Sequence, residues 1–133
     1  ANPYVMVGSD RVFAEPWDPM SWYELQRRGS FPIFMEMYRK KGVPVEEIVR
    51  RNTSLAAEQF NILDRGLLKP GMKADISVID LDRYHYPAPY EIDYSNSTAV
   101  AEGVEYVLVN GTVTLDQGQV LAARAGQVIR RNG

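Results

Sequence analysis

Residues 104–115 read VEYVLVNGTVTL, two apolar runs separated by Asn110-Gly111. The pair Asn-Gly is favoured in a type I′ turn, because both central positions of that turn need a positive φ. β-Branched residues on both sides favour extended strands. We therefore predict an antiparallel hairpin that turns at Asn110-Gly111.

Further strands are predicted on either side of this hairpin. Residues 76–79 (ISVI) are rich in β-branched residues and follow Asp75, which we assign to the turn that starts the strand. Gln117-Gly118-Gln119 predicts another turn, and Val128-Ile129 predicts a last strand. Residues 83–98 lack any periodicity and are predicted to form an ordered loop.

Helical spacing marks the region upstream of residue 42. Apolar residues recur there at i, i+3, i+4 and i+7, which indicates one buried helical stripe. We predict that Ser30 caps this helix and that Gly42 ends it. The stripe consists of Phe31, Phe34, Met35 and Tyr38.

Two shorter helices are predicted to follow. Pro44 suits the start of a helix over residues 45–51, whose acidic residues come first and basic residues last, as the helix dipole favours. Thr53 or Ser54 could cap a third helix that ends near Asn61.

Composition excludes several classes of function. The chain has 133 residues, with 15 Lys and Arg against 17 Asp and Glu, and no long run of one charge. Nucleic acid and membrane surfaces are therefore not expected partners. The absence of cysteine excludes disulfides and thiolate metal ligands, and no apolar run approaches the roughly 20 residues of a transmembrane helix. A cytoplasmic location is expected.

The first residues suggest an interior strand. Tyr4-Val5-Met6-Val7 is a continuous apolar run of the kind found in parallel strands buried on both faces. The next sixty residues contain no second strand of this type, so the chain is expected to begin within a larger fold.

Asp10 follows this run, in Gly8-Ser9-Asp10. Residues at the carboxyl ends of parallel or barrel strands face the active site, where a carboxylate suits acid–base chemistry. A simpler alternative is that Asp10 caps a turn or the next helix.

Several motifs, in this order, resemble those of the N-acyl-D-amino-acid deacylases, a branch of the amidohydrolases. The N-terminal half contributes the Gly-Ser-Asp element, RGSFP at 28–32 and NTSLAAEQF at 52–60. The C-terminal half contributes DRGLLKPGMKADISVID at 64–80, GVEYVLVNG at 103–111 and ARAGQVIR at 123–130. Together these motifs extend over nearly the whole chain.

This resemblance implies an α+β segment of a larger enzyme. Residues 1–62 would be the last strand and closing helices of a TIM-type barrel, and residues 63–133 part of an accessory β-sandwich. The implied reaction is hydrolysis of the amide C–N bond of an N-acyl amino acid or related amide. A divalent metal, usually zinc, would activate the water, with Asp10 as general base. Arg27 and Ser9 would bind the substrate.

The sequence departs from the deacylase pattern at two places. Arg11 follows Asp10 where the family usually has glycine, and residues 24–28 (ELQRR) replace a His-Pro-Arg element. Arg27 lies one residue from the family's arginine and could still pair with a substrate carboxylate. Alternatively, Arg27 and Arg28 form a solvated pair at the start of a helix.

The metal itself cannot be held by this segment alone. The family's His-x-His pair is missing, and His85 is the one histidine of the chain. A protein metal site needs three or four converging donors, so His85 is assigned no role and no residue here is assigned to the metal. The remaining ligands would come from the rest of the barrel in a longer protein.

Two other readings remain open. The chain could be a non-catalytic structural or oligomerisation module derived from an amidohydrolase. It could also be a self-contained small α+β binding domain whose residues 4–7 pair within the chain or with a second copy. An exposed apolar edge of this kind would favour association.

Overall fold

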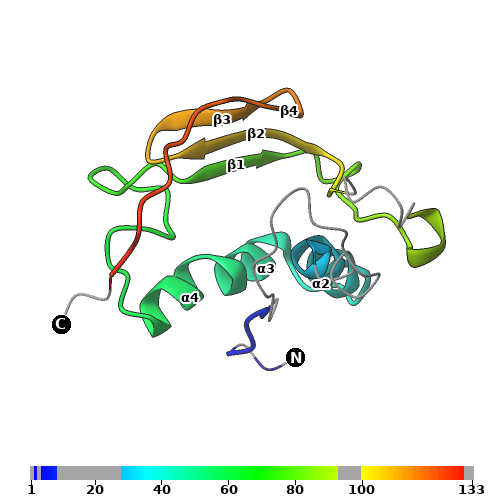
Figure 1. The fold of residues 1–133 in the computed structure, drawn as a ribbon. Coiled ribbons are helices and arrows are strands. Elements are labelled where there is room, and N and C mark those ends of the chain that lie inside the picture. The colour runs from blue at the N-terminus through cyan, green and yellow to red at the C-terminus, as the bar shows by residue number, and fades with distance from the viewer. Residues whose placement is uncertain (1, 3, 9–27, 93–99, 131–133) are drawn as a thin grey trace.

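The computed structural model describes residues 2, 4–8, 28–92 and 100–130. A helical layer comes first in the chain and a β-sheet second (Figure 1). The helices are α2 (Ser30–Lys40), α3 (Val45–Asn52) and α4 (Ser54–Gln59), and a short 3-10 helix η1 spans Pro89–Glu91. The strands are β1 (Ile76–Ile79), β2 (Val104–Val109), β3 (Thr112–Asp116) and β4 (Gln119–Val120). These elements form an α+β arrangement.

Helix α2 begins one residue earlier than its sequence suggests. Its N-cap is Gly29, and Ser30 is the first helical residue, so the prediction that Ser30 caps the helix is wrong. The predicted end of the helix at Gly42 is confirmed. Gly42 adopts a φ of 74° and donates its N–H to the Arg39 carbonyl at 2.9 Å, which satisfies a carbonyl at the helix end.

Thr53 separates α3 from α4. Its φ of −129° and ψ of −92° break the helix, and its hydroxyl donates to the Val49 carbonyl at 2.8 Å. The side chain therefore serves the end of α3, and no side-chain cap precedes α4. Thr53 does stand at the predicted N-cap position of α4, but its side chain does not cap that helix, because its hydroxyl is already used by the preceding turn. Asn61 follows α4 with a φ of 56°, in agreement with the predicted end.

The core lies between α2 and α3. Phe34, Met35 and Ile48 are buried there, and Ile48 is completely inaccessible. Burial of such a side chain contributes about 2 kcal/mol. Val7 from the N-terminal run and Leu81 from the exit of β1 pack against the same cluster. One small core thus joins the N-terminal run, the helices and the start of the sheet.

The sheet is an antiparallel meander in the order β1-β2-β3-β4. The predicted hairpin is confirmed, since Val109 pairs with Thr112 across the turn and Asn110 and Gly111 have φ angles of 50° and 82°. Gln117-Gly118 makes the next turn, as predicted, between β3 and β4.

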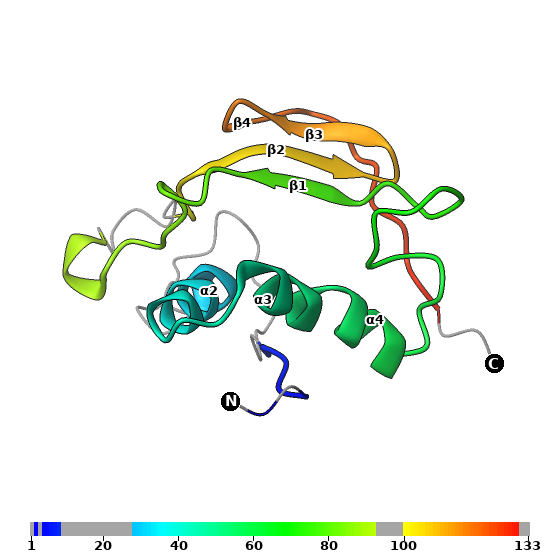
Figure 2. The same cartoon turned by 180° about the vertical axis from the view of Figure 1, so that it is seen from behind.

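The predicted last strand at Val128-Ile129 is wrong. Sheet pairing stops at the Leu121 N–H, which donates to Thr114 O at 2.8 Å. Beyond it, the Ala125 carbonyl accepts a hydrogen bond from the Asn110 side chain at 2.7 Å. This contact holds the segment at the β2–β3 turn, and beyond it the chain runs away from the sheet toward the end of α4 (Figures 1 and 2).

The predicted strand at Tyr4–Val7 is also not formed. Asn2 closes a turn here, because its side-chain oxygen accepts the Tyr4 N–H at 2.9 Å and its carbonyl accepts the Val5 N–H at 3.4 Å. A buried parallel strand needs neighbouring strands, and none pairs with residues 4–8 within the described chain.

No strand residue of the sheet is buried. All six residues of β2 are half-buried, although four are Val or Leu. Within the described residues there is one sheet, so a second layer of a sandwich is not observed. None of the described helices is long and apolar enough to cross a membrane.

Candidate functional site

The three predicted site residues, Ser9, Asp10 and Arg27, lie outside the described residues. The structure does describe the segment that leads to them. Val7 packs against the Phe34, Met35 and Ile48 core, so the chain is anchored two residues before Ser9. Among the described residues, two groups of polar side chains are held in fixed positions, the first of them on α3.

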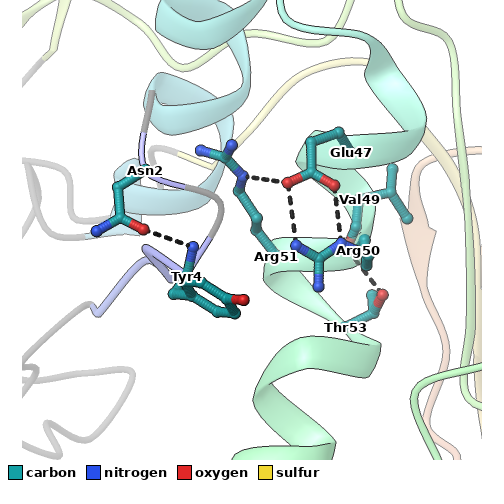
Figure 3. Close-up of polar contacts among 7 residues, drawn as sticks. All are labelled: Asn2, Tyr4, Glu47, Val49, Arg50, Arg51 and Thr53. Carbon is teal, nitrogen blue, oxygen red and sulfur yellow. Dashed lines mark hydrogen bonds and ion pairs between the residues drawn. The ribbon is translucent and has the colours of Figure 1, made fainter.

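Glu47 is the centre of this polar group (Figure 3). Its two oxygens accept hydrogen bonds from Arg50 Nε at 2.7 Å and Nη2 at 3.0 Å, and from Arg51 Nε at 2.9 Å. Spacings of three and four residues place these side chains together on one helix face. The carboxylate thus fastens two guanidinium groups in fixed positions.

Arg51 is the most deeply buried charge of the group. It is 3% exposed, and its guanidinium lies 5.1 Å from the centre of the Tyr38 ring on α2. This cation–π contact, together with the Glu47 ion pair, compensates part of the cost of burying the charge. Its Nη1 has no hydrogen-bond partner. Arg51 thereby links α3 to α2.

The electrostatics make Glu47 a permanent anion. Hydrogen bonds from Arg50 and then Arg51 lower the pKa of Glu47 to about 2. The same contact with Glu47 raises the pKa of Arg50, with smaller contributions from Glu58 and Tyr4. Because its pKa is so low, the Glu47 carboxylate has little affinity for a proton at neutral pH and is a poor general base. The arrangement serves to position the helices rather than to transfer protons.

A second polar group joins the sheet to the helices. Arg65 pairs with Asp75 and donates from Nη2 to Asn110 Oδ1 at 2.9 Å, and the Asn110 N–H donates to Asp75 at 2.7 Å. The Asn110 N–H and then Arg65 hold the pKa of Asp75 below its usual value. Asp75 thus starts β1 as predicted and also fixes the β2–β3 turn.

No group of three or more His, Cys, Asp or Glu side chains that could hold a metal exists in the described part of the chain. His85 Nδ1 lies 3.2 Å from the Arg83 carbonyl, and residue 85 forms an isolated bridge with Glu102. These contacts of residue 85 are local.

Sequence reasoning missed both arginine contacts. The Glu47-to-Arg51 spacing of four residues was visible as a signal for a helical ion pair. No comparable signal exists for Arg65, whose partners lie 10 and 45 residues away. Such contacts depend on how the sheet returns to the helices, which local spacing does not encode.

Comparison with known proteins agrees with this architecture. Residues 4–115 match the model of the amidohydrolase family Amidohydro_3. N-acyl-D-aspartate deacylase of Alcaligenes xylosoxydans xylosoxydans is 30% identical, over 97% of this chain and 24% of its own. N-acyl-D-glutamate deacylase of the same organism is 33% identical, over 96% of this chain and 24% of its own. The chain therefore spans about a quarter of the length of these relatives.

A solved structure shares the fold. D-aminoacylase, studied for its binuclear metal centre, superimposes with a TM-score of 0.67 and 28% identity, over 80% of this chain and 22% of that one. The resemblance in the motif order is thereby confirmed at the level of sequence and of structure. The chain belongs to the Amidohydro_3 amidohydrolase family.

Proposed function

We propose that this chain is the C-terminal part of a metal-dependent hydrolase that cleaves the amide C–N bond of N-acyl amino acids. One observation carries the proposal: 96% and 97% of the chain align with two N-acyl-D-amino-acid deacylases. The superposition on D-aminoacylase supports the same reaction class. In its broader form, the proposal includes hydrolysis of related amides.

In this proposal Asp10 is the general base. It takes a proton from the attacking water and passes it to the leaving amine, which is the role that the resemblance to the deacylases implies for this carboxylate. Ser9 and Arg27 contact the substrate, with the Arg27 guanidinium facing its carboxylate. The anchoring of Val7 in the helix core supports this assignment, because it fixes the chain close to Asp10.

The proposed division of the chain follows the same relatives. Residues 1–62 close a TIM-type barrel, and residues 63–133 belong to an accessory β-sandwich. The half-buried faces of β2 support the second part, because apolar residues on both sides of a sheet favour a covering layer. We place the protein in the cytoplasm, with neither nucleic acid nor membrane as partner.

The described residues do not fit a metal site, since they provide no cluster of ligands. In the proposal the zinc or other divalent ion is therefore held by other residues of the full-length protein. When bound, such an ion makes water acidic enough to react at neutral pH. The 133-residue chain alone is accordingly expected to be inactive.

Hydrolysis of N-acetyl-D-aspartate, N-acetyl-D-glutamate and N-acetyl-D-leucine tests this function. The protein at its natural length should release the amino acid, lose activity in a chelator and regain it with zinc. The 133-residue chain should show neither metal binding nor turnover. Metal-independent turnover by the short chain would overturn the proposal, and so would an inactive, metal-free natural-length protein.

A further inference from the structure

A cationic cavity lies apart from the α3 polar group. Its volume is about 200 Å³, and it lies where the segment after α4, the loop before β1 and the C-terminal segment meet. Three basic side chains line it: Arg65, Lys73 and Arg130. Arg65 and Lys73 come from the α4–β1 link and Arg130 comes from the C-terminal segment, so the cavity exists only in the folded protein.

The charges in this cavity are unevenly distributed. Arg65 is engaged by two carboxylates, Asp75 and Asp64, the latter 3.5 Å from its Nε. The described residues provide no ion pair for Lys73 or Arg130. Asp64 also lines the cavity, but its carboxylate is paired with Arg65. The three basic side chains therefore outnumber the one carboxylate of the lining, which makes the potential positive.

An unused donor points to the same conclusion. Arg65 is 12% exposed, and its buried Nε makes no hydrogen bond, because Asp64 lies at ion-pair distance without the required geometry. A buried donor without an acceptor costs free energy, which an entering acceptor removes. Gln127 and Asn61 add amide groups to the lining.

We propose that this cavity binds a small oxyanion of the phosphate or carboxylate class. Guanidinium and ammonium groups are the usual partners of such anions, and a partly enclosed site strengthens their attraction. An anion held by Lys73 and Arg130 would also fasten the C-terminal segment to the α4–β1 link. The hydrogen bond between the Asn110 side chain and the Ala125 carbonyl already holds the start of that segment, and an anion would add a second contact five residues further on, at Arg130.

Calorimetric titration of the natural-length protein with inorganic phosphate at low ionic strength tests the site. The double variant Lys73→Gln/Arg130→Gln should weaken phosphate binding by at least about tenfold. The matched control Lys69→Gln/Arg124→Gln removes the same charge from exposed positions outside the cavity and should bind as the wild type does. Circular dichroism would check that all three proteins are folded.

Absence of phosphate binding by the wild type would overturn the proposal. Equal weakening in both double variants would overturn it too, because binding would then follow overall charge. Acetate distinguishes the two sources: competition with phosphate indicates a site for carboxylates as well, and failure to compete indicates a phosphate site. The readout is independent of hydrolysis, so failure here leaves the proposed function untouched.

Discussion

The Asn110 N–H donates a hydrogen bond to the Asp75 carboxylate at 2.7 Å, which ties the β2–β3 turn to the start of β1. These residues are 35 positions apart, so the contact closes a long loop. Arg65 binds both side chains from the α4–β1 link. The three residues form one polar connection between the α4–β1 link and the hairpin, beside the apolar contact that Leu81 makes with the helix core.

Asp75→Asn should therefore destabilise the protein in a pH-dependent way. The folded-state pKa of Asp75 is lowered, so its contribution is present above the ordinary pKa and is lost as the pH falls through the lowered value. Because the side chain is one-third exposed, we expect a loss of about 1 kcal/mol at pH 7. Urea unfolding at pH 7 and at pH values below about 4 measures it.

The control for this experiment is Asp82→Asn, at an exposed carboxylate outside the contact. It should change the free energy of unfolding by no more than about 0.5 kcal/mol. A loss for Asp75→Asn that stays constant down to low pH would contradict the linkage.

Arg51→Ala should destabilise the helical pair more than Arg50→Ala does. Arg51 is buried and stacks near Tyr38, whereas Arg50 is 38% exposed. Loss of packing and of the cation–π contact should reduce the free energy of unfolding by about 2 kcal/mol for Arg51→Ala. Chemical denaturation of both variants measures their free energies of unfolding. Equal losses would indicate that burial of Arg51 has no energetic role.

The titration of Glu47 gives a separate test of this group. Its carboxylate should titrate at about 2, and Arg50→Ala should move that midpoint upward, since Arg50 makes the largest contribution. Carbon-detected NMR of the side chain measures the midpoint directly. An unchanged midpoint in the variant would mean that Arg51 or solvent controls Glu47 instead.

Gly29→Ala should loosen the start of α2. A Cβ at this position would lie 2.6 Å from Tyr86 Cγ and 2.9 Å from Ile33 Cδ1, which is closer than van der Waals contact allows. Because Tyr86 is buried, we expect a loss of about 1–3 kcal/mol. Thermal unfolding measures it, with Gly126→Ala as control, since nothing lies within 4 Å of a Cβ there. Equal stability of the two variants would contradict the close approach.

The hairpin and the helices could be predicted from the sequence because each of these elements is determined by residues that lie close together in the chain. Asn110-Gly111 supplied the two positive φ angles, and Gly42 supplied the helix end. The strand predicted at Val128-Ile129 did not form, because a residue distant in the sequence influences the path of the chain there. Its β-branched side chains favour a strand, yet the Asn110 side chain takes the Ala125 carbonyl and the chain leaves the sheet.

The candidate site was predictable only through resemblance. Position after an apolar run suggested Asp10, but a carboxylate there can equally cap a turn. Tyr4–Val7 read as a strand, whereas the described chain has a turn closed by Asn2 and no partner strand for it. Strand formation and burial both depend on distant neighbours, so the short apolar run specified neither: Tyr4 is 76% exposed and Val5 is 39% exposed.

The most direct test of the proposed reaction is the turnover of Asp10→Asn in the natural-length protein, with metal content measured in parallel. The exposed Asp82→Asn serves as control. If Asp10 is the general base, turnover should fall by roughly a hundred- to ten-thousand-fold while metal content and fold stay unchanged, and Asp82→Asn should behave as the wild type. Near-normal turnover of Asp10→Asn would contradict the assignment of Asp10 as the base.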